Sequence, residues 1–294
     1  MTEPAISIGM PVYDGERYLE EALDSLLGQS CGDFNLVISD NASTDNTEAI
    51  CREYAGRDRR IRYVRLERNI GGPRNWNHVV TLATAPYFKW ASANDVCHRD
   101  LLRCCKEVLD AEPNVVLAYP RTNLIDEHGN VIEECNDVLH LREADPCDRF
   151  MRLVNTIGLN NAQAGLIRTE VLRRTGLEGV HRAGDIPLMA ELAILGEFHE
   201  VPERLFYRRM APDATTCGNT DDEWNQFNDP VSSSADRVWR WPYHFRYFAA
   251  VRRAPLTLRQ KARLYRFLAR HVRWDRQGLW RELRAIMRAR SVTS

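Results

Sequence analysis

Short apolar runs alternate with amphipathic segments along most of this chain, a pattern typical of an α/β protein. The apolar runs end abruptly in polar residues and predict strands over residues 5–13, 34–41, 61–66, 87–91, 114–119, 162–168 and 200–208. Apolar positions at helical spacing predict helices over residues 16–29, 45–54, 74–84, 99–111, 146–157, 170–175 and 186–195. We therefore expect a doubly wound, mostly parallel sheet with flanking helices.

The pattern changes in the second half of the chain. The turn 127–130 is expected to join two antiparallel strands, and residues 133–145 are expected to form a loop. We predict one large domain over residues 1–216, a polar loop over 217–234 and a basic, helical C-terminal extension over 235–294.

Composition is that of a globular protein, with 44% hydrophobic and 28% charged residues among 294. The first residues lack the basic and apolar regions of a signal peptide, and no apolar run approaches the roughly 20 residues of a membrane span, so we expect a cytoplasmic protein. Eight cysteines without a C-x-x-C pair predict reduced thiols rather than disulfides or a zinc site. We expect no nucleic-acid partner, and the oligomeric state stays open.

Charge is unevenly distributed, although the net charge is only -1. Between Arg252 and Arg290, the only acidic residues are Asp275 and Glu282, among many arginines. One interpretation is a helix that makes a peripheral contact with the inner face of a membrane. The alternative is an oligomer contact or a cap over the core with solvated arginines, which the aromatic residues of 239–248 favour.

The most informative segment is the strand 87–91, which runs into the polar sequence Ser92-Ala93-Asn94-Asp95. This places a carboxylate at the carboxyl end of a strand, where ligands bind in open α/β sheets. Asp95 could hold a hard cation that neutralises a diphosphate. The structural alternative is that Asn94 and Asp95 form an Asx turn and cap the next helix.

Four sequence blocks in order resemble family 2 of the glycosyltransferases, which have the GT-A fold. They are Pro11-Val12-Tyr13-Asp14, the segment 39–47 (SDNASTDNT), the segment 69–75 (NIGGPRN) and the segment 92–95 (SAND). The resemblance is specific over about the first 95 residues and weakens toward Thr216. It implies that residues 1–95 bind a nucleotide-sugar donor and residues 96–216 bind the acceptor.

By this resemblance, Pro11 and Tyr13 would form the walls around the base and ribose, and Asp40 would accept a hydrogen bond from the base. Arg74 would help to hold the nucleotide. The physical argument agrees, because Asp40 ends a predicted strand and Arg74 opens a helix whose N-terminus favours anions. The structural alternatives are that Tyr13 packs in the core, Asp40 caps a helix and Arg74 is solvated.

The metal motif departs from the family pattern, D-x-D-D. Asn94 and Asp95 remain as candidate ligands, so Mg²⁺ or Mn²⁺ would be held weakly without nucleotide. Related sequences often carry a later block R-R-x-H-P, whose histidine is a further metal ligand by resemblance. In this chain Ala211 stands in the place of that histidine. The two preceding arginines, Arg208 and Arg209, could supply positive charge directly.

The resemblance also implies a catalytic base directly before a late helix, and Asp185 occupies that position. Asp185 would deprotonate an acceptor hydroxyl that attacks the sugar with inversion. Asn160, Asn161 and Gln163 are candidate acceptor-binding residues. The acceptor could belong to a polysaccharide, a glycolipid or a secondary metabolite.

Two other functions compete with this interpretation. Asn94 and Ala211 leave room for a non-catalytic protein that binds sugar nucleotides or glycans. A nucleotidyltransferase would have a similar sheet, but such enzymes carry a Gly-rich, basic loop after the first strand. The segment 13–16 (YDGE) stands there instead.

Overall fold

The computed structural model of this chain describes residues 3–211, 227–230 and 239–292. The strands are β1 (Ile6–Val12), β2 (Phe34–Asp40), β3 (Ile61–Arg65), β4 (Tyr87–Trp90), β5 (Val96–Cys97), β6 (Val115–Ile125), β7 (Val131–Cys135), β8 (Leu166–Arg168) and β9 (Glu197–Arg209). The helices are α1 (Glu16–Leu27), α2 (Thr47–Arg57), α3 (Gly72–Thr81), α4 (Leu101–Ala111), α5 (Pro146–Thr156), the 3-10 turn η1 (Asn161–Ala164), α6 (Thr169–Arg173), α7 (Asp185–Leu195), α9 (Arg240–Arg253), α10 (Leu258–Trp274) and α11 (Arg276–Val292).

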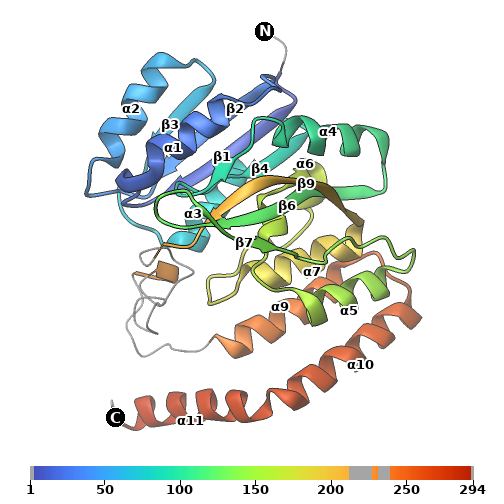
Figure 1. The fold of residues 1–294 in the computed structure, drawn as a ribbon. Coiled ribbons are helices and arrows are strands. Elements are labelled where there is room, and N and C mark those ends of the chain that lie inside the picture. Colours follow the sequence, from blue (N-terminus) through green and yellow to red (C-terminus); the bar gives the residue numbers. More distant parts are fainter. Residues whose placement is uncertain (1–2, 212–226, 231–238, 293–294) are drawn as a thin grey trace.

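Nine strands of the described residues form one sheet in the order β3-β2-β1-β4-β8-β6-β9-β5, with β7 paired to β6 (Figure 1). β1 is parallel to β2 and β4, and β2 is parallel to β3. β8 is antiparallel to β4 and β6, whereas β6 and β9 are parallel. The sheet is thus parallel in the N-terminal half, as the alternation of elements predicted, and mixed beyond it.

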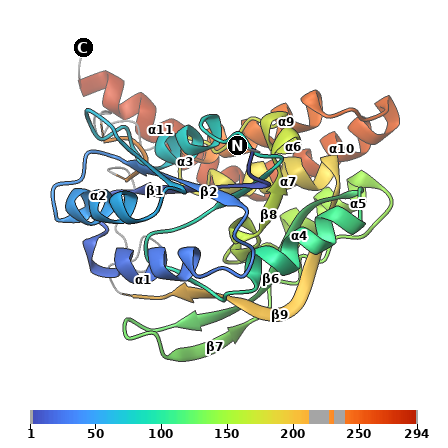
Figure 2. The same cartoon turned by 90° about the horizontal axis from the view of Figure 1, so that it is seen from above.

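Two hydrophobic clusters cover the two faces of this sheet. One contains apolar side chains of α1, α2 and α4 together with alternate residues of β1, from Ile6 to Val12. The other contains side chains of α3, α5, α6 and α7 with Phe88 and Trp90 of β4. Figure 2 shows α1 and α4 on one side of the strands and α3 and α7 on the other. The prediction of helices on both faces is therefore confirmed.

α3 packs directly on β1 because Gly9 has no side chain. A Cβ atom at Gly9 would lie 2.8 Å from the Cβ of Val79, closer than real Cβ contacts. The start of α3 lies beside the carboxyl end of β2, where the Asn75 side-chain amide donates to the Ser39 carbonyl at 2.8 Å, at the edge where parallel α/β sheets bind ligands.

The C-terminal helices α9 and α10 belong to the same core as the sheet. Tyr247, Val251, Leu264 and Phe267 are buried in the cluster that contains Phe150 of α5. Figure 1 shows α10 and α11 along the outer edge of the molecule, beyond α5 and α9. The predicted helical extension is confirmed, and α9 and α10 cover the core as the second interpretation of the basic tail proposed.

Three local predictions differ from the structure. β5, only two residues long, was not predicted, because so short a strand has no periodicity to detect. The predicted strand 162–168 begins as η1, and only Leu166–Arg168 pairs as β8. The predicted loop 133–145 starts inside β7, whose largely exposed, acidic sequence carries no apolar alternation.

Parts of the predicted C-terminal organisation lie outside the described residues. Of the predicted loop 217–234, the structure describes only residues 227–230. Among the helices that it does describe, none combines the length and the apolar character required to span a bilayer. The cysteines at described positions are all free thiols.

Candidate functional site

A cleft of about 530 Å³ opens at the carboxyl ends of β1, β2 and β4, within the range of about 300–1,000 Å³ that ligand sites occupy. Its first wall comes from the N-terminal half and includes Pro11, Tyr13, Asn41, Trp76 and Asn94. Its second wall comes from the later segments and includes Asn160, Glu178, His181, Asp185 and Arg208. Residues more than 150 positions apart therefore meet in one cavity.

A smaller cavity of about 150 Å³ adjoins the cleft. It is lined by Asp95, Asn161 and Gln163. The two cavities share several lining residues, among them Asp185 and Arg208, so these side chains lie where the cavities meet. A substrate bound across both cavities would have a carboxylate and a guanidinium at its middle.

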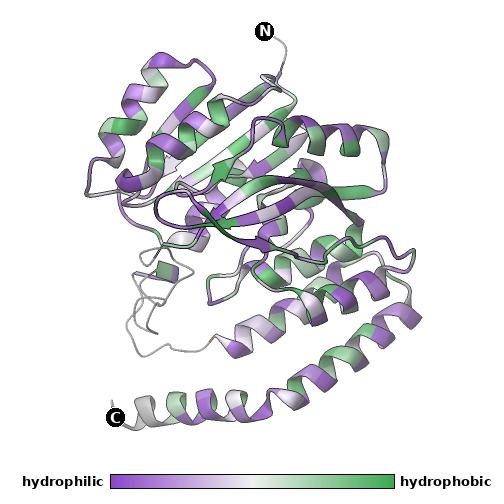
Figure 3. Cartoon of the chain, viewed as in Figure 1, coloured by the Kyte–Doolittle hydropathy of each residue, from purple (hydrophilic) through white to green (hydrophobic). Residues whose placement is uncertain are grey.

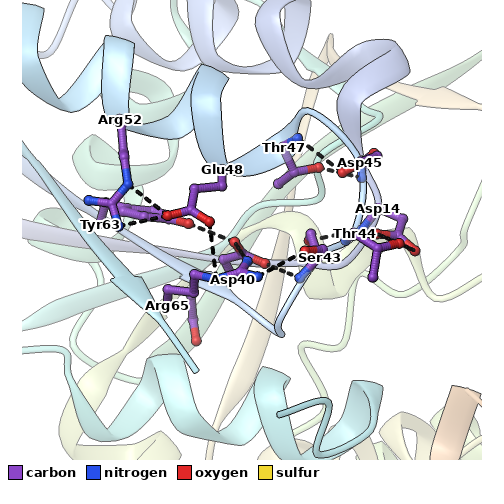
Figure 4. A network of polar contacts seen from close by, with 12 residues as sticks. Asp14, Asp40, Ser43, Thr44, Asp45, Thr47, Glu48, Arg52, Tyr63 and Arg65 are labelled. Carbon is purple, nitrogen blue, oxygen red and sulfur yellow. Dashed lines mark hydrogen bonds and ion pairs between the residues drawn. The ribbon is translucent and has the colours of Figure 1, made fainter. Parts of the chain in front are cut away.

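The loop after β1 and the loop after β2 are fastened to each other, as Figure 4 shows. The amide N–H of Thr44 donates to the carboxylate of Asp14 at 2.6 Å, and the amide N–H of Asp14 donates to the hydroxyl of Ser43 at 3.0 Å. The amide N–H of Gly15 donates to the hydroxyl of Thr47 at 2.9 Å. Most polar residues of the segment 39–47 are thus structural, and they hold Tyr13 at the cleft with 47% of its surface exposed.

Asp40 is fully buried and lies outside the lining of the cleft. Its carboxylate accepts hydrogen bonds from the Ser43 amide at 2.8 Å, the Tyr63 hydroxyl at 2.6 Å and the Arg65 guanidinium at 2.7 Å (Figure 4). Burial would raise the pKa of Asp40, but these hydrogen bonds outweigh it and lower the pKa below its ordinary value. In this structure the carboxylate of Asp40 is already bound by these protein donors. The predicted contact of Asp40 with a base therefore stays a prediction.

Arg74 also has a protein partner. Its guanidinium lies 2.9 Å from the Asp229 carboxylate and donates to the Ile70 carbonyl. Phe227 packs against Gly72, where a Cβ atom would lie 2.3 Å from the phenyl ring. Residues 227–229 therefore cover the start of α3, and the predicted role of Arg74 in holding a nucleotide stays a prediction.

Asp95 and Asn94 stand at the edge that the sequence predicted. One oxygen of Asp95 accepts a hydrogen bond from the amide of Arg209 at 2.9 Å. Burial raises the pKa of Asp95, while the positive charges of Arg208, Lys89 and Arg209 act in the opposite direction. The side-chain oxygen of Asn94 accepts a hydrogen bond from Ser92. Asp95 therefore reaches the cavity with one oxygen already bonded to the protein.

The two adjacent arginines of β9 have different environments. Arg209 is 1% exposed and its guanidinium binds Glu21 and the carbonyls of Asn94 and Asp126. Arg208 lines both cavities and donates to the side-chain oxygen of Asn161 at 2.8 Å. Arg208 is thus placed to meet an anionic ligand, whereas Arg209 links α1, the turn after β6 and the segment before β5.

Asp185 begins α7 and is positioned by Asn160. The Asn160 amide donates to one oxygen of Asp185 at 2.6 Å and to Gln163 at 3.1 Å. Asn160 has a φ of 56°, in the left-handed region that asparagine tolerates better than most residues. Among the described residues, the side-chain oxygen of Asn160 and the amide nitrogen of Gln163 are buried without a hydrogen-bond partner. The three predicted acceptor residues therefore line the smaller cavity together with Asp185, and Asn160 and Gln163 offer polar atoms for a ligand.

Glu178 and His181 were not predicted, and both line the cleft. Within the described part of the chain, Glu178 Oε2 and His181 Nε2 are buried without a hydrogen-bond partner. Burial and the nearby charge of Asp185 raise the pKa of Glu178 well above its ordinary value. Burial lowers the pKa of His181. The only sequence signal was their position in the glycine-containing segment before Asp185.

The residues at this site could coordinate a divalent cation only if oxygens of a bound phosphate ligand completed its shell. The described residues contain no group of three or more His, Cys, Asp or Glu side chains that could hold a metal ion. Asp95 has one oxygen without a hydrogen-bond donor among these residues, and Asn94 supplies an amide oxygen. Mg²⁺ commonly takes one or two protein ligands and completes its shell with phosphate and water.

The sequence of the first half matches a known family. Residues 7–142 match the model of Glycosyl transferase family 2. An uncharacterized glycosyltransferase of Methanocaldococcus jannaschii is 29% identical over 136 residues, which cover 46% of this chain and 47% of that protein. A chondroitin synthase of Escherichia coli is 22% identical over 263 residues, 89% of this chain and 36% of that protein. The chain thus spans about half or less of the length of these relatives.

Solved structures agree in fold. S. aureus TarS residues 1–349, in complex with UDP-GlcNAc, has a TM-score of 0.67 at 19% identity, covering 92% of this chain and 74% of that one. A mannosyltransferase from Pyrobaculum calidifontis, in complex with GDP-Man and Mn²⁺, has a TM-score of 0.55 at 16% identity, covering 98% and 86%. The chain therefore has the GT-A fold, and its residues 7–142 match the model of glycosyltransferase family 2.

Proposed function

We propose that this chain transfers a sugar from a nucleotide-sugar donor to an acceptor hydroxyl, with inversion at the anomeric carbon. One observation carries the proposal: Tyr13, Asp95, Arg208 and Asp185 line two adjoining cavities in a chain with a family 2 domain. These side chains supply an aromatic wall, a carboxylate, a cation and a candidate base.

The donor would occupy the wall formed by the ends of β1 and β2. The exposed ring of Tyr13 offers a face for a base or ribose, and Pro11 and Asn41 lie beside it. Arg208 would bind the diphosphate, because its guanidinium is oriented by Asn161 and faces both cavities. Mg²⁺ or Mn²⁺, held by Asp95 and Asn94, would neutralise further phosphate charge when bound.

Asp185 would act as the general base. Its carboxylate would take the proton of the acceptor hydroxyl while the hydroxyl oxygen forms a bond to the anomeric carbon. The bond from that carbon to the diphosphate oxygen breaks, and Arg208 stabilises the negative charge on the departing nucleoside diphosphate. Attack from the face opposite the leaving group inverts the linkage. Asn160 orients the base through its 2.6 Å hydrogen bond.

The relatives support a saccharide acceptor. The E. coli relative is a chondroitin synthase, and a Bacillus subtilis relative, 27% identical over 132 residues, is named a putative teichuronic acid biosynthesis glycosyltransferase. We propose that this chain acts in the assembly of a polysaccharide or glycolipid. Decoration of a secondary metabolite is the alternative that the same chemistry allows.

A thermal-shift screen identifies the donor. UDP-glucose, UDP-GlcNAc, UDP-glucuronate and GDP-mannose are compared with and without MnCl₂. A ligand at about 100 times its dissociation constant stabilises a protein by about 2.7 kcal/mol, so the true donor should raise the melting temperature. Stabilisation that needs Mn²⁺ would support Asp95 and Asn94 as ligands.

The Asp185→Asn variant tests the base. We expect kcat for sugar transfer to fall by about 100- to 10,000-fold with unchanged stabilisation by the donor. Asp33→Asn, which changes an exposed carboxylate, is the control and should match the wild type. Near-normal turnover in Asp185→Asn would show that another group removes the proton.

A non-catalytic protein that binds sugar nucleotides is the second candidate, because only one carboxylate remains in the segment 92–95. This candidate predicts stabilisation by a nucleotide sugar with no release of nucleoside diphosphate, by hydrolysis or transfer, under any metal condition. The same screen followed by an assay for released nucleotide separates the two functions.

A further inference from the structure

The last two helices present a continuous strip of exposed arginine and large apolar side chains, which we call the outer strip. Its members recur at helical spacing on the solvent side of α10 and α11 and are Arg259, Arg266, Arg270, Arg273, Trp274, Arg276, Trp280, Arg281, Arg284 and Met287. Figure 3 shows hydrophilic and hydrophobic residues alternating along both helices. In Figures 1 and 2, both helices lie on the side of the sheet opposite α1.

The apolar members of the outer strip are largely exposed to solvent. Trp274 is 70% exposed, Trp280 is 58% exposed and Met287 is 53% exposed. The opposite side of the same helices already supplies the packing, through Leu264, Leu268 and other buried residues. Large apolar side chains grouped on a surface indicate an interaction site.

The arginines of the outer strip have no acidic partner among the described residues. The two acidic residues of this region bind other groups: Asp275 pairs with Arg240 and His244, and Glu282 accepts the backbone N–H groups at the start of α9. Arg266 and Arg276 donate only to carbonyls of nearby residues. The positive charge of the strip is therefore available to an external anion.

The arginines behind the strip are used differently. Arg253 pairs with Glu191, and Arg263 pairs with Asp145 and Asp148. Arg246 donates to the carbonyls of Gly176 and Leu177. The inner arginines of the basic tail thus join separate segments of the fold, whereas the hydrogen bonds of the outer ones, within the described part of the chain, stay among nearby residues of α10 and α11.

We propose that the outer strip binds the surface of an anionic lipid bilayer. Tryptophan prefers the boundary between headgroups and acyl chains, and each basic residue near an anionic membrane strengthens binding by about fivefold. A symmetric contact between two copies through this strip would oppose arginine to arginine, which disfavours a dimer here. In Figures 1 and 2, α11 extends toward the side where β1 and β2 end, so binding would keep the cleft near the bilayer.

Co-sedimentation of the full chain with vesicles tests the proposal. The probe is a vesicle with seven parts phosphatidylcholine to three parts phosphatidylglycerol, compared with pure phosphatidylcholine. We expect binding to the anionic vesicle at about 0.02 M salt and release at about 0.5 M salt, because screening shortens the range of the attraction. No binding at low salt, or equal binding to both vesicles, would overturn the proposal.

Two variants and a matched control assign the binding to the strip. Arg270→Glu/Arg281→Glu should weaken binding by at least about 20-fold. Trp274→Ser/Trp280→Ser should weaken it several-fold and leave it sensitive to salt. Arg59→Glu/Arg62→Glu makes the same charge change at two exposed positions, one just before β3 and one in it, and should bind like the wild type.

Two further outcomes would contradict the assignment. The first is equal loss of binding in the Arg59/Arg62 control. The second is a stable dimer in light scattering that Arg270→Glu/Arg281→Glu converts to monomers, which would make the strip a protein interface. If a variant folds poorly, the salt and lipid dependence of the wild type still decides. None of these results depends on whether the cleft transfers sugar.

Discussion

Asp185 and Glu178 line the same cleft, yet their carboxylates have different environments. Asp185 accepts a hydrogen bond from Asn160, whereas Glu178 Oε2 is buried without a partner in the described residues. The backbone of Glu178 is fixed by Asn77, which exchanges two hydrogen bonds of 2.9 Å with it. The nearby charge of Asp185 adds to burial in favouring the neutral form of the Glu178 carboxyl.

The titration of Glu178 should appear in stability. Burial, followed by the charge of Asp185, raises its pKa well above the ordinary value, and Arg246 opposes this. Its contribution is therefore fully present below the unfolded-state pKa of about 4.3 and is lost as pH rises through the folded-state pKa. The melting temperature of wild type should fall relative to Glu178→Gln as pH rises.

Thermal denaturation of both proteins across pH checks this expectation. Glu203→Gln, at an exposed position, serves as the control and should parallel the wild type. His181, Arg182 and Arg208 also line the cleft and are unchanged in the comparison. Parallel curves for wild type and Glu178→Gln would show that the buried carboxyl does not titrate differently in the folded state.

Asn160 offers a second test at this scale. Asn160→Gly removes the amide that orients Asp185 while keeping a backbone that accepts the φ of 56°. A hydrogen bond to a charged group contributes about 1.5–3 kcal/mol, so kcat for transfer should fall by about 10- to 100-fold. Gln163→Ala removes a partner of Asn160 but not of Asp185, so it should lower kcat by a smaller factor. Equal turnover in Asn160→Gly and wild type would contradict the orienting role.

Residue roles could be predicted only where a chain position defines them. Asp185 was predicted because it directly precedes a helix at the place where the resembling family has its base, and Asp95 because it follows a strand; both roles stay predictions. Asp40 was also placed at a strand end, but its carboxylate is occupied by Arg65 and Tyr63. Glu178 had no such marker, since its burial depends on α3 and α9.

At the scale of elements, the contact between α3 and β1 sets the position of the cleft wall. A Cβ atom at Gly9 would lie 2.8 Å from Val79, so Gly9→Ala forces the helix away from the strand. We expect a loss of about 1–3 kcal/mol in the free energy of unfolding, measured by urea denaturation. Donor binding should weaken as well, because Trp76 of α3 lines the cleft.

Gly56→Ala is the matched control for this substitution. Gly56 lies in α2, and a Cβ atom there meets nothing within 4 Å. Alanine should stabilise the helix by up to about 1 kcal/mol. If both substitutions changed stability in the same direction and by a similar amount, the close packing at Gly9 would not be the cause.

Long elements were predicted well because their apolar pattern repeats several times. α1, α4 and α5 lie within two residues of the predicted ends, and β1 to β4 follow the apolar runs. η1 was mistaken for a strand because the structure of Asn161–Ala164 depends on contacts of Asn161 with Asp137 and Arg208. A short segment under such distant constraints has no periodic signal of its own.

At the scale of the whole molecule, α9 holds the segment that carries Glu178 and Asp185. Arg246 donates to two carbonyls of that segment, and Arg253 forms two hydrogen bonds, of 2.9 and 2.8 Å, with Glu191 of α7. Glu191 also accepts the amide of Gly176. The C-terminal helices therefore stabilise the acceptor side of the proposed site.

Arg253→Met tests this connection. The side chain of Glu191 is only 5% exposed, and without Arg253 its charge would lose its cation. Removing the partner of a fully buried charge lowers the free energy of unfolding by about 3–5 kcal/mol. Because Arg253 is itself 39% exposed, we expect a smaller loss of about 2 kcal/mol, measured by urea denaturation. Arg263→Met breaks exposed ion pairs and should cost less than about 1 kcal/mol. Equal costs would contradict a special role of the Arg253 pair.

The sequence alone determined the order of most strands and helices, the edge of the sheet that carries the polar strand ends, and the position of Asp95 on that edge. These properties follow from local backbone periodicity and from neighbouring residues, which a chain displays directly. Tertiary structure alone decided which partner each polar side chain has. The amide that binds Asp95 is 114 positions away, and the arginine that binds Asp40 is 25 positions away. Such pairings depend on strand order and helix packing, which bring distant segments together only after the whole core has formed.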